Sequence, residues 1–270
     1  MTKTAYIGID NTSRKVKTMY VGVDGIARKV KKAYIGVEGV AREWYSAGKK
    51  ASEYNVGDIV LLSENGTNVE YIVVHQGLPS SMYDASCNGT WLLRKKIYIE
   101  KEWHTSKVND YKNSSIHSYL NNTFLKVFDT ATKSVIKQVK IPYRAGSGSS
   151  ATVTSGKSGL STKVFLLSAC ELGFNYSGIP TPYGELEYFS NCATNSSSSK
   201  RKAYLGNTAS YWCTRSPYCG GNSTEYIIVV GDTGDTAHLY CNGALGIRPA
   251  IVLDGSTNFN PETNVIEMEG

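Results

Sequence analysis

The sequence predicts an α+β protein, in which antiparallel strands and two helices follow a small all-β module of repeats. Three observations predict it. A fourteen-residue pattern is written three times near the start of the chain. Most of the remainder consists of short apolar runs rich in β-branched and aromatic residues, separated by polar, glycine-rich turns. Between residues 114 and 139 the apolar residues instead recur at helical spacing, and helices gathered in one part of the chain are typical of this class.

The repeats occupy residues 1–46 and carry a tyrosine at one fixed position, as Tyr6, Tyr20 and Tyr34. In the second copy two strand-like arms flank Asp24-Gly25, which predicts a hairpin with a type I′ turn, because glycine tolerates the positive φ that this turn requires. An isolated hairpin of this size is marginal in water, so each copy is expected to pair with its neighbours or with other chains. Two arrangements stay open, a small β-prism and a meander packed on the main domain.

Three regions follow from this pattern. Residues 1–46 are expected to be a docking or oligomerisation module that forms a homotrimer. Residues 47–53, which contain glycine, lysine and serine, are expected to be a linker. Residues 54–270 are expected to form the second domain, which is long enough for a sizeable core.

The second domain is expected to be rich in strands. An Asn65-Gly66 hairpin turn is predicted to join the first two of them. A Gly/Ser/Thr-rich segment, residues 144–162, is expected to be a long mobile loop. The predicted strands span 56–62, 69–74, 91–94, 163–167, 211–217, 226–230, 237–240 and 246–253.

Two helices are expected between the strands. Ser114 or Ser115 is predicted to cap the first, whose apolar residues recur as far as Val127. The second is predicted over residues 130–139, ending before a proline. Further on, Ser168 and Glu171 have the spacing of a capping box, which predicts another short helix.

Composition excludes several classes of function. The net charge is +6, and the basic residues concentrate in the repeats and around residues 94–101. The sequence has no motif of basic and aromatic residues that would line a nucleic-acid groove, so no nucleic-acid partner is expected. The chain has no secretory-type start and no apolar stretch of membrane-spanning length, so we expect it to fold in a cytoplasm without membrane insertion. Six scattered cysteines without a C-x-x-C pattern predict free thiols.

Four blocks of the second domain resemble a family of uncharacterised domains of gut bacteria and their phages. They are Val56–Val60, Lys163–Ser168, Tyr211–Pro217 and Gly246–Ala250, and the resemblance covers roughly residues 54–254. That family is similar to the C-type-lectin fold, in the branch shared by formylglycine-generating enzymes and the variable proteins of diversity-generating retroelements. The repeats resemble those of tail fibres from phages that infect Gram-positive gut bacteria.

The resemblance implies a C-type-lectin-like domain that acts as a phage receptor-binding protein, diversified by a retroelement. The implied partners are a host-surface glycan or protein and other phage tail proteins, and the implied location is the virion, assembled in the host cytoplasm. The rivals are a formylglycine-type oxidase, a bacterial surface adhesin and a purely structural tail spike.

The candidate ligand-binding residues lie between the last two blocks, over residues 218–242. Tyrosine, asparagine, serine, glycine and aspartate dominate there, which is typical of adaptable binding loops. Ordinary turn composition and strand packing are the alternatives. The candidates are Tyr218, Asn222, Ser223, Thr224, Glu225, Tyr226, Asp232, Thr233, Asp235, Thr236, His238, Tyr240 and Asn242.

No catalytic residue, cofactor or metal site is expected, and the protein is interpreted as a non-enzyme. Cys213 lies near the place of a catalytic cysteine in formylglycine-generating enzymes, but Thr208 stands where the second cysteine would be needed. A structural calcium ion at Asp232, Asp235 and His238 is left open. The arginines at 215 and 248 are interpreted as scaffold that pairs with carboxylates or carbonyls beneath the ligand face.

Overall fold

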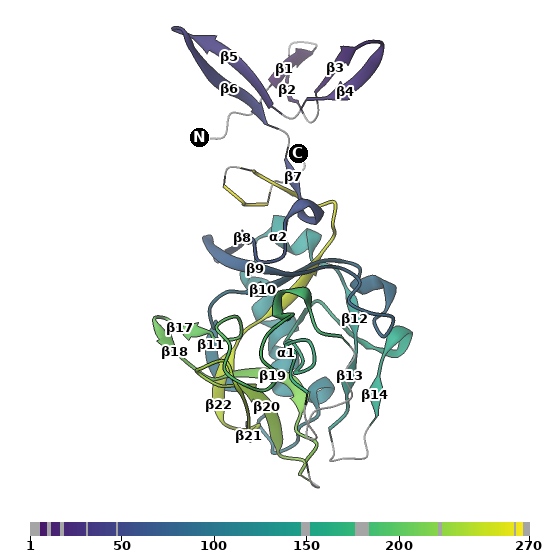
Figure 1. Ribbon diagram of the computed structural model, residues 1–270, viewed down its shortest axis with the longest axis vertical. Helices are drawn as coiled ribbons and strands as arrows, with labels where there is room; N and C mark the ends of the chain where they lie inside the picture. The colour runs from purple at the N-terminus through teal and green to yellow at the C-terminus, as the bar shows by residue number, and fades with distance from the viewer. Residues whose placement is uncertain are drawn as a thin grey trace.

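Two five-stranded sheets form the centre of the molecule in the computed structural model (Figure 1). The structure describes residues 6–9, 12–16, 19–30, 32–46, 48–146, 152–175, 184–220, 223–261 and 263–266. The first sheet has the order β16 (Val164–Phe165), β23 (Ala250–Leu253), β10 (Gly89–Arg94), β9 (Thr67–Gly77), β8 (Ile59–Glu64), and is antiparallel. The second has the order β11 (Ile99–Glu102), β22 (Ala244–Ile247), β19 (Trp212–Pro217), β20 (Tyr226–Val230), β21 (Thr236–Tyr240).

The second sheet is antiparallel except where β19 and β22 run parallel. Mostly antiparallel sheets with segregated helices make this an α+β protein, as predicted. The core between and around the sheets buries Trp91, Trp103 and Trp212 completely. No helix of the described chain is long and apolar enough to cross a bilayer.

The predicted strand over residues 246–253 is in fact two strands in different sheets. The break falls at Arg248-Pro249, because proline has no N–H for a ladder. The Pro249 carbonyl instead accepts from the Arg94 N–H at 2.9 Å, and Arg248 Nε donates to the Arg94 carbonyl at 2.8 Å. This crossing ties the two sheets together.

Helix α1 (Ser115–Asn122) confirms the first helix prediction. Ser114 is the N-cap, and its Oγ accepts from the His117 N–H at 3.2 Å. Ile116 and Leu120, one turn apart, are buried. The apolar spacing then continues in a 3₁₀ turn, η4 (Phe124–Val127), rather than in the same helix.

Helix α2 (Thr130–Val135) begins where predicted, and Asp129 caps it by accepting from the Thr132 N–H at 2.7 Å. Its predicted end at residue 139 is wrong. Ile136 bridges to Leu253, and β12 (Val139–Ile141) pairs with β15 (Leu160–Thr162). Strand partners distant in the sequence therefore outweigh local helix propensity here.

The segment expected as a mobile loop, residues 144–162, is structured over most of its length. β13 (Tyr143–Arg144) pairs with β14 (Val153–Thr154), and η6 (Gly156–Ser158) leads into β15. Residues 147–151 lie outside the described residues. The predicted strand 163–167 is shorter than expected, because only β16 pairs within a sheet. The remaining short elements are η2 (Ala85–Cys87), η3 (Tyr111–Asn113), η7 (Glu187–Phe189), β17 (Tyr204–Leu205) and β18 (Thr208–Ala209).

The N-terminal repeats form three separate hairpins, as their pattern predicts. They are β1 (Tyr6–Ile9) with β2 (Thr12–Lys15), β3 (Tyr20–Val23) with β4 (Ile26–Lys29), and β5 (Lys32–Val37) with β6 (Val40–Ser46). Asp24 and Gly25 have φ values of 52° and 74°, those of a type I′ turn. Within the described residues each hairpin is its own two-stranded sheet, so the single chain forms neither a prism nor a meander on the main domain.

The expected linker, residues 47–53, is partly folded into the second domain. β7 (Lys49–Lys50) pairs with β24 (Asn258–Phe259), and η1 (Ala51–Glu53) follows it. Ala51 is completely buried, and its N–H donates to the Thr257 carbonyl at 2.8 Å. The boundary of the domain therefore lies near residue 48, and the pairing of β7 with β24 holds the beginning and end of the domain together.

Candidate ligand-binding face

Four of the sequence-predicted residues come together as a cluster of stacked rings on β20, β21 and the loop before β20. Tyr226 and Tyr240 pair directly across the two strands, and their ring centroids lie 4.3 Å apart with an interplanar angle of 29°. Tyr218 stacks on His238 at 4.1 Å and 9°. Tyr226 meets His238 edge to face at 5.5 Å, which joins the two stacks. We call Tyr218, Tyr226, His238 and Tyr240 the aromatic face.

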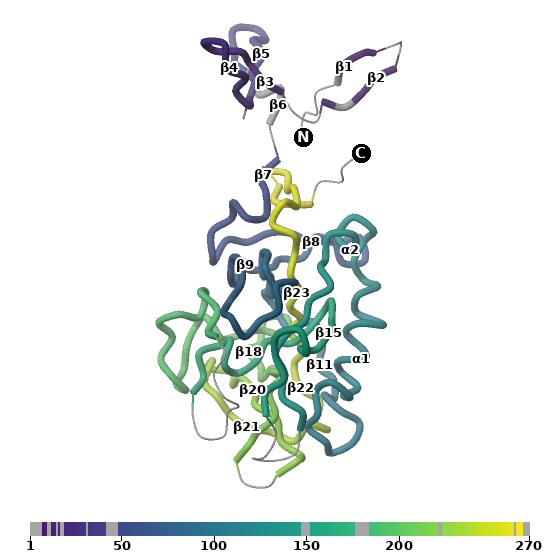
Figure 2. The backbone as a smooth tube through the Cα atoms, turned by 90° about the vertical axis from the view of Figure 1, so that its right-hand side faces the viewer, coloured from purple at the N-terminus to yellow at the C-terminus, as the bar shows by residue number. Residues whose placement is uncertain are grey.

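Two members of the aromatic face, His238 and Tyr240, are open to solvent, whereas Tyr218 and Tyr226 are half-buried. Tyr240 is 45% exposed, and His238 is exposed beside it on β21, the outermost strand of its sheet. Both views of the backbone place β20 and β21 at the end of the molecule remote from the hairpins (Figures 1 and 2). Aromatic rings exposed together in one patch are typical of a surface that binds a ligand, because binding removes their apolar area from water.

Two charged residues border the aromatic face. Lys107 Nζ lies 5.0 Å from the centroid of the Tyr240 ring and 3.8 Å from a carboxylate oxygen of Glu225. The side-chain hydrogen bond with Tyr240, followed by partial desolvation, raises the pKa of Tyr226. The face therefore offers ring surfaces, hydroxyl groups, a cation and a carboxylate within one patch.

Segment 104–110 braces the aromatic face from a distant part of the sequence. The Asn109 N–H donates to the Thr224 carbonyl at 2.7 Å, and Asn109 Nδ2 donates to the Tyr226 carbonyl at 2.8 Å. The Cys241 N–H donates to the Glu225 carbonyl at 2.9 Å. Sequence reasoning missed Lys107 and Asn109, since no spacing links them to residues more than a hundred positions away.

The two aspartate candidates, Asp232 and Asp235, lie elsewhere, in the turn that joins β20 to β21. Thr236 and Tyr240 stand at opposite ends of β21, about 13 Å apart at the usual rise of a strand. Asp232 and Thr233 are exposed, and Thr233 donates to Asp235 Oδ1 at 2.7 Å. This turn packs on residues 197–201 and forms a second polar group beside the aromatic face, not a continuation of its ring stacks.

The remaining candidates line the loops at the other end of the strands. Thr224 is exposed, and Ser223 and Asn242 are half-buried. The Ser223 hydroxyl accepts from the Glu225 N–H at 3.4 Å. Asn222 lies outside the described residues.

The calcium alternative finds no geometric support at Asp232, Asp235 and His238. Across the part of the chain that the structure describes, no three histidine, cysteine, aspartate or glutamate side chains converge as a metal site would require. Asp235 is instead engaged by the hydroxyl of Thr233.

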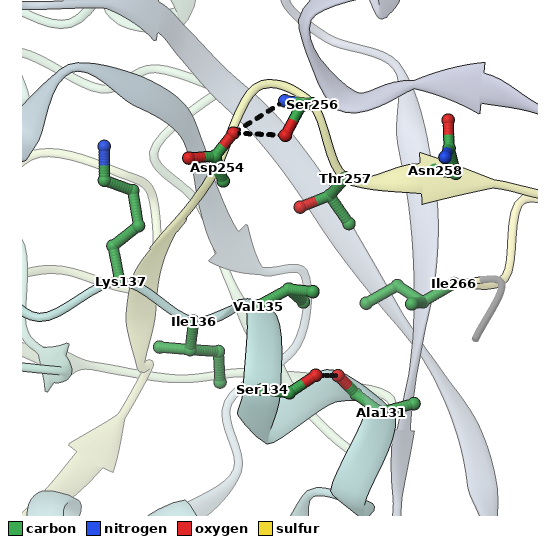
Figure 3. Close-up of a pocket in the computed structure, with 10 residues that line it drawn as sticks. All are labelled: Ala131, Ser134, Val135, Ile136, Lys137, Asp254, Ser256, Thr257, Asn258 and Ile266. Atoms are coloured by element: carbon green, nitrogen blue, oxygen red, sulfur yellow. Dashed lines mark hydrogen bonds between the residues drawn. The ribbon is translucent and has the colours of Figure 1, made fainter. Parts of the chain in front are cut away.

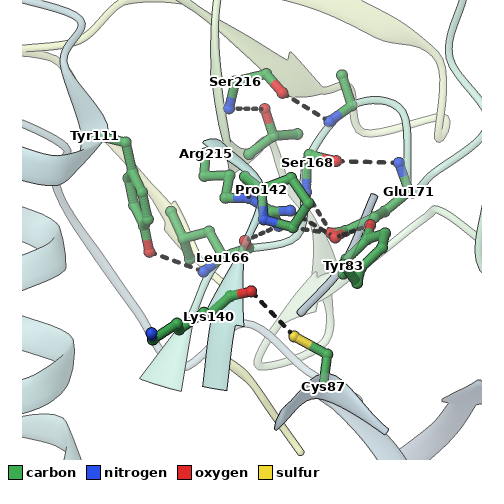
Figure 4. A network of polar contacts seen from close by, with 12 residues as sticks. Tyr83, Cys87, Tyr111, Lys140, Pro142, Leu166, Ser168, Glu171, Arg215 and Ser216 are labelled. Atoms are coloured by element: carbon green, nitrogen blue, oxygen red, sulfur yellow. Dashed lines mark hydrogen bonds and ion pairs between the residues drawn. The ribbon is translucent and has the colours of Figure 1, made fainter. Parts of the chain in front are cut away.

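A buried ion pair holds the strand that precedes the aromatic face (Figure 4). Arg215 on β19 is 1% exposed and binds Glu171 through two hydrogen bonds, from Nη1 at 2.6 Å and from Nη2 at 2.5 Å. It also donates to the carbonyls of Pro142 and Leu166 at 3.0 and 2.9 Å. This confirms the interpretation of Arg215 as scaffold paired with a carboxylate and carbonyls.

Both carboxylate oxygens of Glu171 accept further hydrogen bonds besides those from Arg215. Tyr83 donates to it at 2.7 Å, and the Ser168 N–H donates at 2.8 Å. The Glu171 N–H returns a bond to Ser168 Oγ at 3.1 Å, so the predicted capping-box bonds form. The predicted helix does not form, and residues 169–173 make a turn instead.

Two further arginines anchor loops. Arg248 is buried against the ring of Trp212 and donates to the Arg94 carbonyl, which confirms its expected pairing with a carbonyl, and burial lowers its pKa to about 10. Arg201, which sequence reasoning missed, is also fully buried. Its guanidinium donates to the carbonyls of Gly234, Leu172, Ala193 and Ser196.

Cys213 is a core residue. It is completely buried on β19, and desolvation raises the pKa of its thiol far above the ordinary value. A thiol held protonated in this way is a poor nucleophile and a poor metal ligand. None of the six cysteines forms a disulfide, as predicted, and all are thiols.

A polar cleft of about 440 Å³ lies between α2 and residues 254–258, away from the aromatic face (Figure 3). Asp254 Oδ1 accepts from the backbone and hydroxyl of Ser256, at 2.8 and 2.6 Å. Lys137 Nζ is occupied by the Asn88 carbonyl. Because these charged groups already bind within the chain, we assign no function to this cleft.

The fold and this face define an α+β protein that carries exposed aromatic rings on the outermost strand of a braced sheet. The chain belongs to a family of domains of unknown function, DUF6273, whose model matches residues 88–255. The matched region contains β10 to β23, the buried ion pair and the whole aromatic face, whereas the hairpins lie outside it. No curated protein and no solved structure matches the chain.

Proposed function

We propose that this chain is a non-enzymatic receptor-binding protein of a phage tail fibre, and that its aromatic face contacts a ligand on the surface of the host cell. The observation that carries the proposal is the stacking of Tyr218 on His238 and of Tyr226 on Tyr240, with His238 and Tyr240 exposed to solvent. Tyrosines concentrated in a patch are typical of binding surfaces, where they supply large contact area at a low cost in side-chain entropy.

The rigidity of the aromatic face supports recognition. Each ring is already held by another ring, and the backbone beneath is braced by Asn109, so little freedom remains to be lost on binding. Lys107 and Glu225 at the border can select among ligands by charge and hydrogen bonding. A cell-wall glycan, a teichoic acid and a surface protein all offer groups that fit such a patch.

The proposal also includes a C-type-lectin-like fold for the second domain. Its support is the sequence resemblance, together with the paired ends of the domain at β7 and β24 and the irregular loops between β12 and β19.

Retroelement diversification has a separate genetic test. A reverse transcriptase gene nearby, and a near-copy of the segment that encodes residues 211–250 differing at adenines, would establish it.

The rivals make different predictions. An oxidase of the formylglycine type would need an accessible thiolate, whereas Cys213 is completely buried. A structural tail spike would tolerate loss of the aromatic rings with adsorption unchanged. A bacterial surface adhesin would use the same surface, and genes for tail proteins upstream distinguish the phage protein from it.

The test is binding of the fluorescently labelled full-length protein to a panel of Gram-positive gut bacteria, purified teichoic acids and arrayed glycans. Tyr226→Ala and Tyr240→Ala should each weaken binding about tenfold or more, the effect of losing a central aromatic contact. Tyr204→Ala is the matched control, because Tyr204 is 40% exposed but lies on the β17–β18 hairpin.

The melting temperature decides how a loss of binding is interpreted. Variants of the aromatic face should melt near the wild-type temperature, since their rings are largely outside the core. If binding by both variants equals that of the wild type, or if Tyr204→Ala reduces it as much, the aromatic face is not the contact surface.

A further inference from the structure

The N-terminal hairpins expose aliphatic faces that the described part of the same chain does not cover. In β3–β4, Val21 pairs with Arg28 and Val23 pairs with Ile26, so these side chains share one face. All of them are exposed, Ile26 to 59%. The corresponding aliphatic residues are Ile7 and Ile9 in the first hairpin and Ile35, Val37 and Val40 in the third.

The opposite face of the second and third hairpins combines a tyrosine with an open space. Tyr20 is 64% exposed, and next to it Gly22 pairs with Ala27. In the third hairpin the same face carries Tyr34 and the Gly36–Ala41 pair. We call this the tyrosine face, and it consists of one large ring beside two residues with little or no side chain.

The repeated glycine on the tyrosine face has no explanation within one chain. Gly8, Gly22 and Gly36 do not have a positive φ, and a Cβ at any of them would meet nothing within 4 Å. Glycine in a strand weakens it. Its recurrence at the same place in all three hairpins is explained if something outside the chain occupies the space beside each tyrosine.

The partner must match three hairpins that recur every fourteen residues. A surface complementary to all three must itself repeat at this spacing, and a second copy of this chain meets that condition directly.

The exposed apolar area of the hairpins is also sufficient for a stable interface. Among the hairpin residues whose side chains the structure describes, ten large apolar side chains are exposed. At roughly 100 Å² each they present on the order of 1,000 Å², comparable with the roughly 800 Å² per partner of a standard interface.

We propose that the hairpins of several copies of this chain pack together, with the aliphatic faces inward and with Tyr20 and Tyr34 each seated over a Gly–Ala pair of a neighbouring chain. The inference rests on the proposed function for its purpose, which is to bring several aromatic faces to one cell surface. The placement of the hairpins and the aromatic face at opposite ends of the molecule suits this purpose (Figures 1 and 2). Joined copies gain avidity without any new contact to the ligand.

The test measures the mass of the full-length chain by light scattering and sedimentation velocity over roughly micromolar to hundred-micromolar concentrations. The wild type should exceed the 29.5 kDa of one chain, with a trimer expected. Val21→Lys combined with Ile35→Lys should shift it to the monomer. Ile99→Lys is the matched control, since Ile99 is 40% exposed but lies on β11, and it should leave the mass unchanged.

A second variant tests the tyrosine face. Gly22→Val combined with Gly36→Val should raise the dissociation constant of the assembly at least tenfold, although valine favours a strand, because its side chain fills the space that a neighbouring tyrosine needs. If the hairpins served only a single chain, the same change would be neutral or stabilising. Tryptophan fluorescence should show an unchanged unfolding transition of the second domain in all variants.

The outcomes separate this inference from the proposed function. A wild type that stays monomeric, or lysine and valine variants that assemble like the wild type, would overturn the hairpin interface, whatever the protein binds. An assembled wild type that binds no bacterial cell or wall polymer would leave the interface standing and overturn receptor binding. If both proposals hold, the monomeric lysine variant should keep the binding of a single face and lose avidity by about tenfold or more.

Discussion

The buried pair of Arg215 and Glu171 should be strongly coupled, and a double-mutant cycle can measure it. Arg215→Met keeps most of the side-chain volume but leaves Glu171 completely buried without its cation. Breaking a buried pair on one side costs about 3–5 kcal/mol in the free energy of unfolding, because one charge is left uncompensated. Glu171→Gln should cost a similar amount, since it leaves the guanidinium without its anion.

The double variant should be much less destabilised than the sum of the two single variants. Gln at 171 can accept from the Ser168 N–H through its oxygen and donate to the Tyr83 hydroxyl through its amide, and no charge remains buried. The two unpaired carbonyls of Pro142 and Leu166 should cost about 1–3 kcal/mol each at most. With central values of about 8 kcal/mol for the sum of the single variants and about 4 kcal/mol for the double variant, we expect a coupling free energy of about 4 kcal/mol.

Urea unfolding followed by tryptophan fluorescence provides the assay, because Trp91, Trp103 and Trp212 are all completely buried. The slope of the unfolding free energy against urea concentration should be the same in all variants, so that shifts of the unfolding midpoint report changes in stability. Additive losses in the double variant, within about 0.5 kcal/mol, would refute the reasoning, because independent sites add to within that limit.

Two further predictions concern the turn before β21 and the effect of pH. Gly234→Ala should destabilise the protein by about 1–3 kcal/mol. The φ of Gly234 is +82°, and a Cβ there would lie 2.0 Å from the Ser198 carbonyl oxygen. Gly206→Ala should cost less, because Gly206 has a φ of +61° but open space around it. Thermal unfolding of both variants checks this, and equal losses would contradict it. Burial lowers the pKa of His75 and of His117 below the usual 6.5, so the unfolded chain binds more protons and stability should fall as pH drops below about 6.5. His75→Gln with His117→Gln should flatten this dependence between pH 5 and 6.5 in urea titrations, and an unchanged slope would contradict the assignment.

The sequence specified features that depend on neighbouring residues. The Asp24-Gly25 and Asn65-Gly66 turns were predictable because a type I′ hairpin requires positive φ at two adjacent positions, and both pairs have it. The start of α1 followed from Ser114 for a similar reason, since a cap acts within one turn of helix. The members of the aromatic face were singled out as candidates by composition alone.

Long-range partners accounted for the failures. The second helix ends early because Val139–Ile141 pairs with a strand that comes some twenty residues later. The run at 246–253 was expected as one strand, and its division between two sheets depends on where the Arg94 backbone lies. Local patterns carry no information about such partners, so element boundaries were the least predictable part of the fold.

The sequence by itself determined the α+β class, the three hairpins and the tyrosine-rich segment that supplies most of the aromatic face, because hydrophobic period, turn chemistry and composition act over a few residues. Only the tertiary structure decided which of those residues meet. It stacked Tyr218 on His238 and Tyr226 on Tyr240, set the acidic turn apart from them, and brought Lys107 to the border from another part of the chain. The physical reason is that strand register and packing join side chains that the sequence keeps far apart.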